Sequence, residues 1–179
     1  GINVTNGAIE ISIDTTIIGR SAGDVVDEVL SQAKKKIGNL EKQFDFVMLF
    51  LPPGTILGGA SDWKAYAYLN FYLSVYNDEW TKYPSIHIHE LGHNIGLSHS
   101  HSDSSYGDDG CMMGLSSKEL DGPRRCFNAA KSWQLGWYRD KHKILDIEQI
   151  NDNFYRLNGV SSYKDDTNDP YTVIKINNC

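Results

Sequence analysis

The sequence predicts a single α+β domain, in which a mixed α/β first half is followed by a smaller and less regular second half. The 179 residues suffice for one domain with a sizeable buried core. Strand-length apolar runs and one long segment with helical spacing occupy the chain as far as residue 96. Beyond residue 100 the chain becomes polar and glycine-rich. We therefore expect an N-terminal subdomain of about residues 1–96 and a C-terminal subdomain of about residues 97–179.

The first half offers one helix among candidate strands. Residues 8–14 alternate apolar and polar side chains, as a half-buried strand does. Residues 21–37 place their apolar side chains at helical spacing. Residues 46–51 form a continuous apolar run, which predicts a strand buried on both faces. An aromatic-rich segment then predicts one or two further strands, at residues 65–70 and 71–75.

A second helix is expected to begin at Pro84, because proline suits the first turn of a helix. Its residues share a face opposite the metal that we expect to pack against the sheet, made of Ile88, Leu91, Gly92 and Ile95. The second half predicts a short helix and three strand-like pieces, at residues 128–135, 144–147, 154–157 and 171–176.

The most informative segment lies on and after this second helix and reads HELGHNIGLSH from His89 to His99. On a helix, His89 and His93 lie one turn apart, so both side chains can reach one metal ion. Glu90 is one position round the helix, close to the ion without having to ligate it. Gly96 can adopt the left-handed conformation that ends a helix, and the turn brings His99 back as a third ligand.

This ligand set predicts one catalytic Zn²⁺ rather than a closed structural site. Three protein ligands leave a fourth coordination position for water, and Glu90 is placed to act as its general base. A bare HExxH sequence arises by chance, but the extended spacing of all three histidines is far more specific. Other histidines fit less well: His87 lies on the wrong face of the helix, and a solvated loop is the simpler reading of His101.

Composition excludes several classes of protein. A net charge of −6 argues against nucleic-acid binding, and no apolar run is long enough to span a membrane. The chain begins without methionine or a signal peptide, so we expect a mature or excised domain. We also expect a monomer. Secretion is expected, and the sequence Asn3-Val4-Thr5 is a possible glycosylation site.

The three cysteines and a group of aspartates suggest further sites. Cys111 and Cys126 flank a loop, and a disulfide between them would stabilise the fold by roughly 3 kcal/mol. Free thiols in a cytosolic protein are the alternative, and Cys179 has no evident partner. The segment SDSSYGDDG at residues 102–110 could hold Ca²⁺ through Asp103, Asp108 and Asp109. The spacing of these aspartates matches no established calcium-binding loop, and solvated carboxylates are the simpler interpretation.

Several segments of the sequence resemble those of a known group of enzymes. The extended zinc motif resembles that of the metzincin clan of zinc endopeptidases. The surrounding sequence is similar to one branch, the gametolysin family of peptidases (M11), known from algal cell-wall lysins. The similar segments read SVYND, HELGHNIGLSHS, YGD with MMG, and CFNAAKSWQLGWY, and they cover about the middle third of the chain.

The resemblance implies a metzincin (zincin-like) fold, with a twisted, mostly parallel sheet and helices, and a smaller irregular C-terminal subdomain across the active-site cleft. It also implies a Met-turn beneath the zinc ligands, for which Met113 is the better match and Met112 the alternative. Several metzincins have a tyrosine two residues after that methionine, where this chain has Leu115. We therefore assign no tyrosine a catalytic role, and Tyr106 nearby would need a different geometry.

The function expected from these residues is zinc-dependent hydrolysis of peptide bonds in proteins, including matrix or cell-wall glycoproteins. Glu90 would assist the attack of a zinc-bound water, and the substrate would pair with an exposed sheet edge, for which residues 65–70 are the candidate. An internal strand is the alternative for that segment. A non-catalytic zinc or peptide-binding module, or a zinc amidase acting on wall polymers, remains the alternative function.

Overall fold

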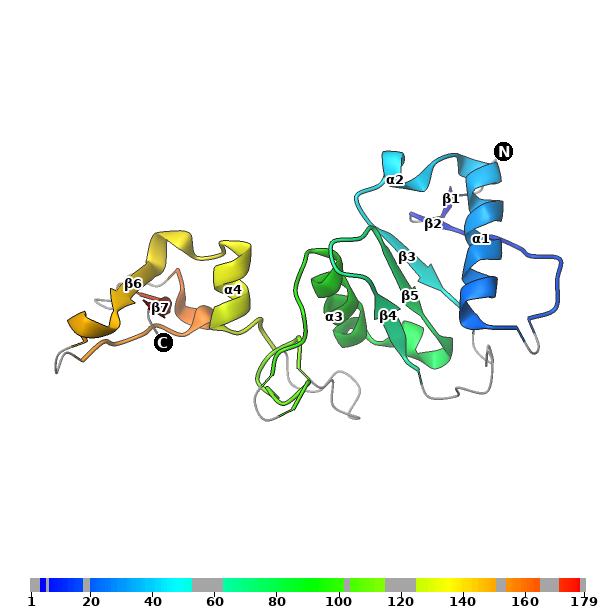
Figure 1. Ribbon diagram of the computed structural model, residues 1–179. Coiled ribbons are helices and arrows are strands. Elements are labelled where there is room, and N and C mark those ends of the chain that lie inside the picture. The colour runs from blue at the N-terminus through cyan, green and yellow to red at the C-terminus, as the bar shows by residue number, and fades with distance from the viewer. Residues whose placement is uncertain are drawn as a thin grey trace. The chain divides into compact units, whose positions relative to one another are not determined.

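The computed structural model describes residues 4–5, 7–17, 20–52, 63–101, 104–114, 125–150, 154–164 and 171–177. The chain divides into two compact units, Gly1–Ser98 and His99–Cys179 (Figure 1). Among the described residues, no helix is long and apolar enough to cross a membrane. The chain is thus a mixed α/β protein with helices and short sheets in both units.

The first unit is built on a three-stranded mixed sheet. The strands lie in the order β3-β5-β4, with β3 parallel to β5 and β4 antiparallel to it. A separate two-stranded pair is formed by β1 and β2. The elements of this unit are β1 (Val4–Thr5), β2 (Ala8–Ile9), α1 (Ala22–Ile37), α2 (Leu40–Gln43), β3 (Val47–Phe50), β4 (Ala65–Ala67), β5 (Leu73–Tyr76), the 3₁₀ helix η1 (Asp78–Lys82) and α3 (Pro84–Asn94).

Helix α1 covers one face of this sheet and supplies half of the core. Its start is fixed by Ser21, whose side-chain oxygen accepts a hydrogen bond from the backbone of Asp24 at 3.1 Å. Its buried valines pack against the sheet in one cluster, made of Val25, Val26, Val29, Leu51, Leu73 and Val75. Figure 1 shows α1 lying along the sheet beside β3. This apolar layer holds β5, which lies in the middle of the sheet.

Three predictions for the first unit were wrong in detail. Residues 46–51 are not buried on both faces, because Val47 and Leu49 pack against the α1 cluster whereas Phe46 and Phe50, which alternate with them, are 44% and 46% exposed. Of residues 8–14, only Ala8–Ile9 forms a strand. Of the face predicted for α3, Gly92 is buried, but Ile88 and the C-cap residue Ile95 are exposed; the helix also buries Ile86 and Asn94. The Asn94 amide donates to the Leu73 carbonyl at 3.1 Å, so a polar anchor holds α3 against β5.

The second unit contains less regular structure. Its elements are α4 (Ala129–Leu135), β6 (His142–Asp146), β7 (Val173–Asn177) and the 3₁₀ helices η2 (Arg139–Lys141), η3 (Ile147–Gln149) and η4 (Val160–Ser162). Strands β6 and β7 pair in parallel. Residues 154–157, predicted as a strand, contribute only a bridge between Leu157 and Tyr171.

Helix α4 begins and ends at residues suited to those places. The Asn128 side chain accepts from the Lys131 backbone at 2.9 Å, and Gly136 adopts a left-handed conformation with φ of 70°. The Trp137 N–H then donates to the Ser132 carbonyl at 2.9 Å, which satisfies one of the last carbonyls of the helix.

Candidate metal centre

Helix α3 positions the first half of the predicted motif. Pro84 occupies its first turn, as expected, since that position needs no N–H donor. His89, Glu90 and His93 are all buried, with exposed fractions of 8%, 6% and 8%. The rings of His89 and His93 have centroids 5.0 Å apart, as residues one turn apart on a helix should. Three polar side chains buried together require a partner or a function.

The end of α3 redirects the chain toward the third histidine. Gly96 has φ of 92°; its N–H donates to the His93 carbonyl and the Leu97 N–H donates to the Gly92 carbonyl, both at 2.9 Å. This is the hydrogen-bond pattern of a Schellman motif. A side chain at position 96 would also meet the Asn70 side-chain oxygen at 2.5 Å. The predicted glycine turn is therefore present. Glycine is favoured at position 96 for two independent reasons, the positive φ and the close approach of Asn70.

The turn also fixes the proton on His93. Its Nδ1 lies 2.7 Å from the Leu97 carbonyl oxygen. Because a carbonyl oxygen can only accept, Nδ1 carries the proton and Nε2 is left with its lone pair for a metal. Leu97 is fully buried, so the contact is held in place by packing.

The ligand atoms of His89, His93 and His99 all lie within 4.8 Å of one another. Among the described residues, these three form the one group of side chains that could hold a metal ion. His87 and His101 are outside it: the His87 Nε2 lies 3.0 Å from the Thr81 carbonyl, and His101 is exposed. Three imidazole donors suit zinc, so the side chains present fit the predicted ion.

Glu90 is buried without a compensating charge. Its Oε2 has no hydrogen-bond partner among the described residues. Loss of solvent around the carboxylate raises the pKa of Glu90 from 4.5 to about 7 in the metal-free protein. A carboxyl group with this pKa can both accept and donate a proton near neutral pH.

The segment after His99 folds back through a tight turn. The Ser100 N–H donates to the Met113 carbonyl at 2.8 Å, and the Gly114 N–H donates to the Cys111 carbonyl at 3.0 Å. A Cβ at Gly114 would lie 1.8 Å from the Asp108 carbonyl oxygen, so only glycine fits there. Met113 is fully buried and Met112 nearly so. The backbone of Met113 thus holds the residue that follows His99.

A comparison with models of known protein families shows to which family the chain belongs. The model of the family described as gametolysin peptidase M11 matches residues 4–160. The chain belongs to this family. A search of curated proteins found no match. Membership makes the M11 chain a peptidase, with proteins or peptides as substrates, and its three-histidine cluster supports a metal-dependent activity.

The predicted disulfide is not present in this M11 chain. Cys111 and Cys126 are free thiols, although their backbones form a bridge in which the Met112 N–H donates to the Cys126 carbonyl. The two side chains have different surroundings, because Cys111 is fully buried whereas Cys126 is exposed. The Cys111 sulfur instead accepts hydrogen bonds from the Ser100 hydroxyl at 3.0 Å and the Asn128 N–H at 3.3 Å. Cys179 lies outside the described residues.

Two side chains at His99 were not predicted. The Tyr106 ring lies against the His99 ring, with centroids 3.9 Å apart. The Lys131 ammonium donates to the His99 carbonyl at 3.3 Å and is 9% exposed, which is unusual for lysine. The sequence offered one signal for the contact between Tyr106 and His99: Tyr106 follows His99 by seven residues, with a turn between them.

The aspartates do not form a calcium site in the described residues. Asp108 accepts hydrogen bonds from the Gly110 N–H at 2.9 Å and from the Asn128 amide at 2.8 Å, so it supports the loop. Asp103 lies outside the described residues, as do Leu115 and Asn3.

Proposed function

We propose that the chain is a zinc-dependent endopeptidase in which Glu90 is the general base. The observation that carries this proposal is a buried, unpaired Glu90 carboxylate oxygen on the same helix as two of three convergent histidines, in a chain of a peptidase family. A binding module would have no chemical need for that carboxylate, whose burial is costly.

His89, His93 and His99 would hold the ion, with the Leu97 carbonyl orienting His93. Zinc in such a site polarises the scissile carbonyl and acidifies water. Glu90 accepts a proton from the attacking water and delivers it to the leaving amine nitrogen as the C–N bond breaks. Met113 is proposed as the Met-turn methionine, supported by its complete burial and its backbone bond to Ser100.

The substrate is proposed to bind as an extended strand along β4. This strand lies at an edge of the described sheet, paired on its other side with β5. An edge strand leaves backbone N–H and C=O groups for an incoming peptide. We also propose secretion, a monomeric state and matrix or wall glycoproteins as substrates. The assignment of wall glycoproteins rests on the resemblance to the gametolysin family.

The decisive experiment compares the wild type with Glu90→Gln on denatured casein, with and without a zinc chelator. We expect one zinc per chain in both proteins and chelator-sensitive cleavage by the wild type. Cleavage by the variant should fall by at least about 10³-fold, because the general base is lost. Glu79→Gln, an exposed residue outside the cluster, is the matched control and should cleave normally.

Other outcomes point to the alternative functions. Zinc binding without cleavage of any protein would support a binding module, and release of amines or acetate from wall polymers alone would support an amidase or deacetylase. Wild-type turnover by Glu90→Gln would contradict the assignment of the base.

A further inference from the structure

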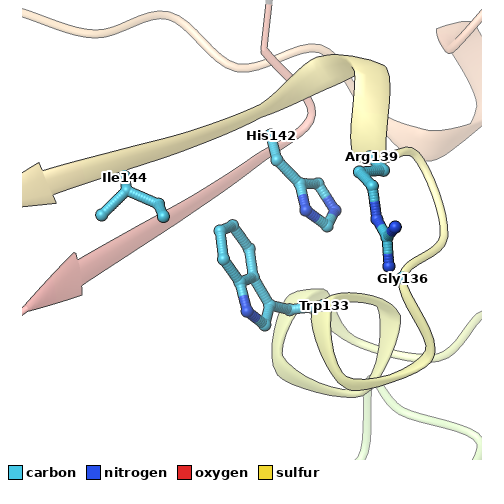
Figure 2. A pocket seen from close by; sticks show the side chains of 5 residues that line it. All are labelled: Trp133, Gly136, Arg139, His142 and Ile144. Atoms are coloured by element: carbon cyan, nitrogen blue, oxygen red, sulfur yellow. The ribbon is translucent and has the colours of Figure 1, made fainter.

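The second unit contains a cavity that the proposed peptidase chemistry does not use. It has a volume of about 340 Å³ and is lined by Trp133, Gly136, Arg139, His142 and Ile144 (Figure 2). These residues come from α4, the turn after it, η2 and β6, all within one unit. None of them belongs to the histidine cluster. The volume is at the lower end of the range of about 300–1,000 Å³ typical of small-ligand sites.

One wall of the cavity is flat and apolar. The Trp133 and His142 rings are stacked, with centroids 4.3 Å apart and an interplanar angle of 12°. The His142 Nε2 donates to the Trp137 carbonyl at 2.7 Å, which fixes the ring. Ile144 is 52% exposed and extends this wall along β6. A rigid aromatic surface of this kind favours a ligand with an apolar part.

The other side of the cavity is cationic. Arg139 is exposed, and its guanidinium lies over Gly136, where a Cβ would be 2.8 Å from a guanidinium nitrogen. Among the described residues, the Arg139 side chain has no hydrogen-bond or ion-pair partner. The Lys175 ammonium lies 5.8 Å from the centre of the Trp133 ring and adds a second positive charge.

Neighbouring carboxylates have other partners. Asp140 accepts from the Tyr163 hydroxyl at 2.7 Å, and Asp146 accepts from the Asn177 amide at 3.1 Å. A local excess of positive charge in a chain of net charge −6 selects for an anion. The planar guanidinium matches a carboxylate, which it can bind through two parallel hydrogen bonds.

We propose that this cavity binds the carboxylate of a peptide, with the apolar part of the same residue against Trp133 and Ile144. Arg139 supplies the hydrogen bonds and the Trp133 wall supplies the apolar contact. The carboxylate belongs either to a peptide C-terminus or to an acidic side chain, and both present the same group to Arg139. This binding is independent of the proposed peptidase mechanism, because it involves none of the metal-ligating residues.

The test uses NMR of the intact zinc-loaded protein, following the Trp133 indole N–H, which is assigned by its loss in Trp133→Phe. N-acetyl-leucine probes a terminal carboxylate, and N-acetyl-glutamic acid α-amide probes a side-chain carboxylate. For probes of this size we expect Kd on the order of 1–10 mM. The neutral probes N-acetyl-leucinamide and N-acetyl-glutaminamide should shift the signal far less. The tighter of the two acids identifies the source of the carboxylate.

Substitutions separate this site from binding at the metal, which carboxylates can also ligate. Arg139→Gln should weaken acid binding at the Trp133 signal by at least about tenfold. Arg139→Lys should fall between that variant and the wild type, and Lys164→Gln, an exposed control, should have no effect. Equal shifts from acids and amides, unchanged binding in Arg139→Gln, or no shift below about 50 mM would each overturn the proposal.

Discussion

The two units of the chain hold the histidines of the candidate metal-binding cluster by different means. In the first unit, α3 rests on a sheet whose other face is covered by α1 through an aliphatic cluster of six buried residues. In the described part of the second unit, the turn next to His99 is held by polar and sulfur contacts centred on Cys111, which accepts from Ser100 and Asn128. Hydrophobic burial is non-directional, whereas a hydrogen-bond network fixes specific positions.

This difference predicts different responses to mutation. The first unit should lose stability when apolar volume is removed, because its core is close-packed. The second should lose the placement of His99 when a single donor or acceptor is removed, with a smaller loss of stability. The protein carries tryptophans in both units, Trp63 and Trp80 in the first and Trp133 and Trp137 in the second. Fluorotryptophan resonances can therefore report each unit separately.

The largest effect is expected from a core truncation in the first unit. Leu73→Ala should destabilise it by about 3–5 kcal/mol, because Leu73 is 6% exposed and belongs to the aliphatic cluster. The matched substitution in the second unit is Leu145→Ala, at 4% exposure. We expect about 2–3 kcal/mol there, since Leu145 lies outside the six-residue aliphatic cluster.

Urea unfolding followed by fluorotryptophan NMR measures both losses. An equal cost at the two leucines would contradict the proposed difference between the units. Loss of the Trp133 and Trp137 native signals in Leu73→Ala before those of Trp63 and Trp80 would contradict it as well.

The next effect is a pH dependence that belongs to the first unit. The pKa of Glu90 is about 7 in the folded metal-free protein against an ordinary 4.5, because burial disfavours its charged form. The folded state therefore binds more protons than the unfolded state between these values. Stability is highest below pH 4.5 with respect to this group and falls as pH rises through 7, by up to about 3 kcal/mol.

Unfolding of metal-free protein at pH 5 and pH 8 measures this fall. Glu90→Gln removes the ionisable group, so the variant should lose the corresponding slope, while Glu79→Gln should keep it. A wild type that becomes more stable across this interval, with a slope unaffected by Glu90→Gln, would contradict the assigned cause.

The residues of the candidate site could be predicted from the sequence better than the burial of the strands. Spacing alone located the three histidines and Glu90, because the periodicity of a helix and the freedom of Gly96 are local properties. The exposure of individual side chains was harder to predict than the positions of these four residues. The apolar run at residues 46–51 predicts a strand buried on both faces, but a run of this kind does not reveal that only Val47 and Leu49 pack against the α1 cluster while Phe46 and Phe50 are exposed.

The side-chain contacts around His99 could not be predicted from the sequence for a related reason. Sequence separation placed Cys111 and Cys126 close enough for a disulfide, and the structure does bridge their backbones. It could not show that the Cys111 sulfur is buried against Ser100 and Asn128 while Cys126 is exposed. Side-chain direction in an irregular loop depends on tertiary contacts rather than on a repeating pattern.

A smaller effect tests the hydrogen-bond network through two asparagines that both begin helices. Asn39 accepts from the Lys42 backbone in the first unit, and Asn128 accepts from Lys131 in the second. Asn128 also donates to Asp108 at 2.8 Å, so Asn128→Ala should cost about 2 kcal/mol and Asn39→Ala about 0.5–1 kcal/mol. Only Asn128→Ala should weaken zinc binding, measured by competition with a chromophoric chelator.

Asn128→Asp sharpens the comparison because it preserves the helix cap and removes the donor to Asp108. It should retain α4 and still weaken zinc binding. Equal effects of Asn39→Ala and Asn128→Ala on zinc affinity would show that the network around Asp108 does not support the ligand.

The smallest effect concerns the ring that lies against His99, the proposed third ligand. Tyr106 and His99 have centroids 3.9 Å apart, and Tyr106 is 39% exposed, so we infer that it acts as a positioning residue through its ring. Tyr106→Phe should preserve zinc affinity and kcat, whereas Tyr106→Ala should weaken zinc binding by about three- to tenfold, since an aromatic pair contributes about 0.5–1.5 kcal/mol. Tyr83→Ala, which removes a ring paired with Trp80 in the first unit, is the control and should leave zinc affinity unchanged. If Tyr106→Phe lost turnover while keeping its zinc, the hydroxyl would take part in the reaction. Such a result would give this chain a reacting tyrosine at position 106, in place of the tyrosine that several metzincins have two residues after the proposed Met-turn methionine, where this sequence has Leu115.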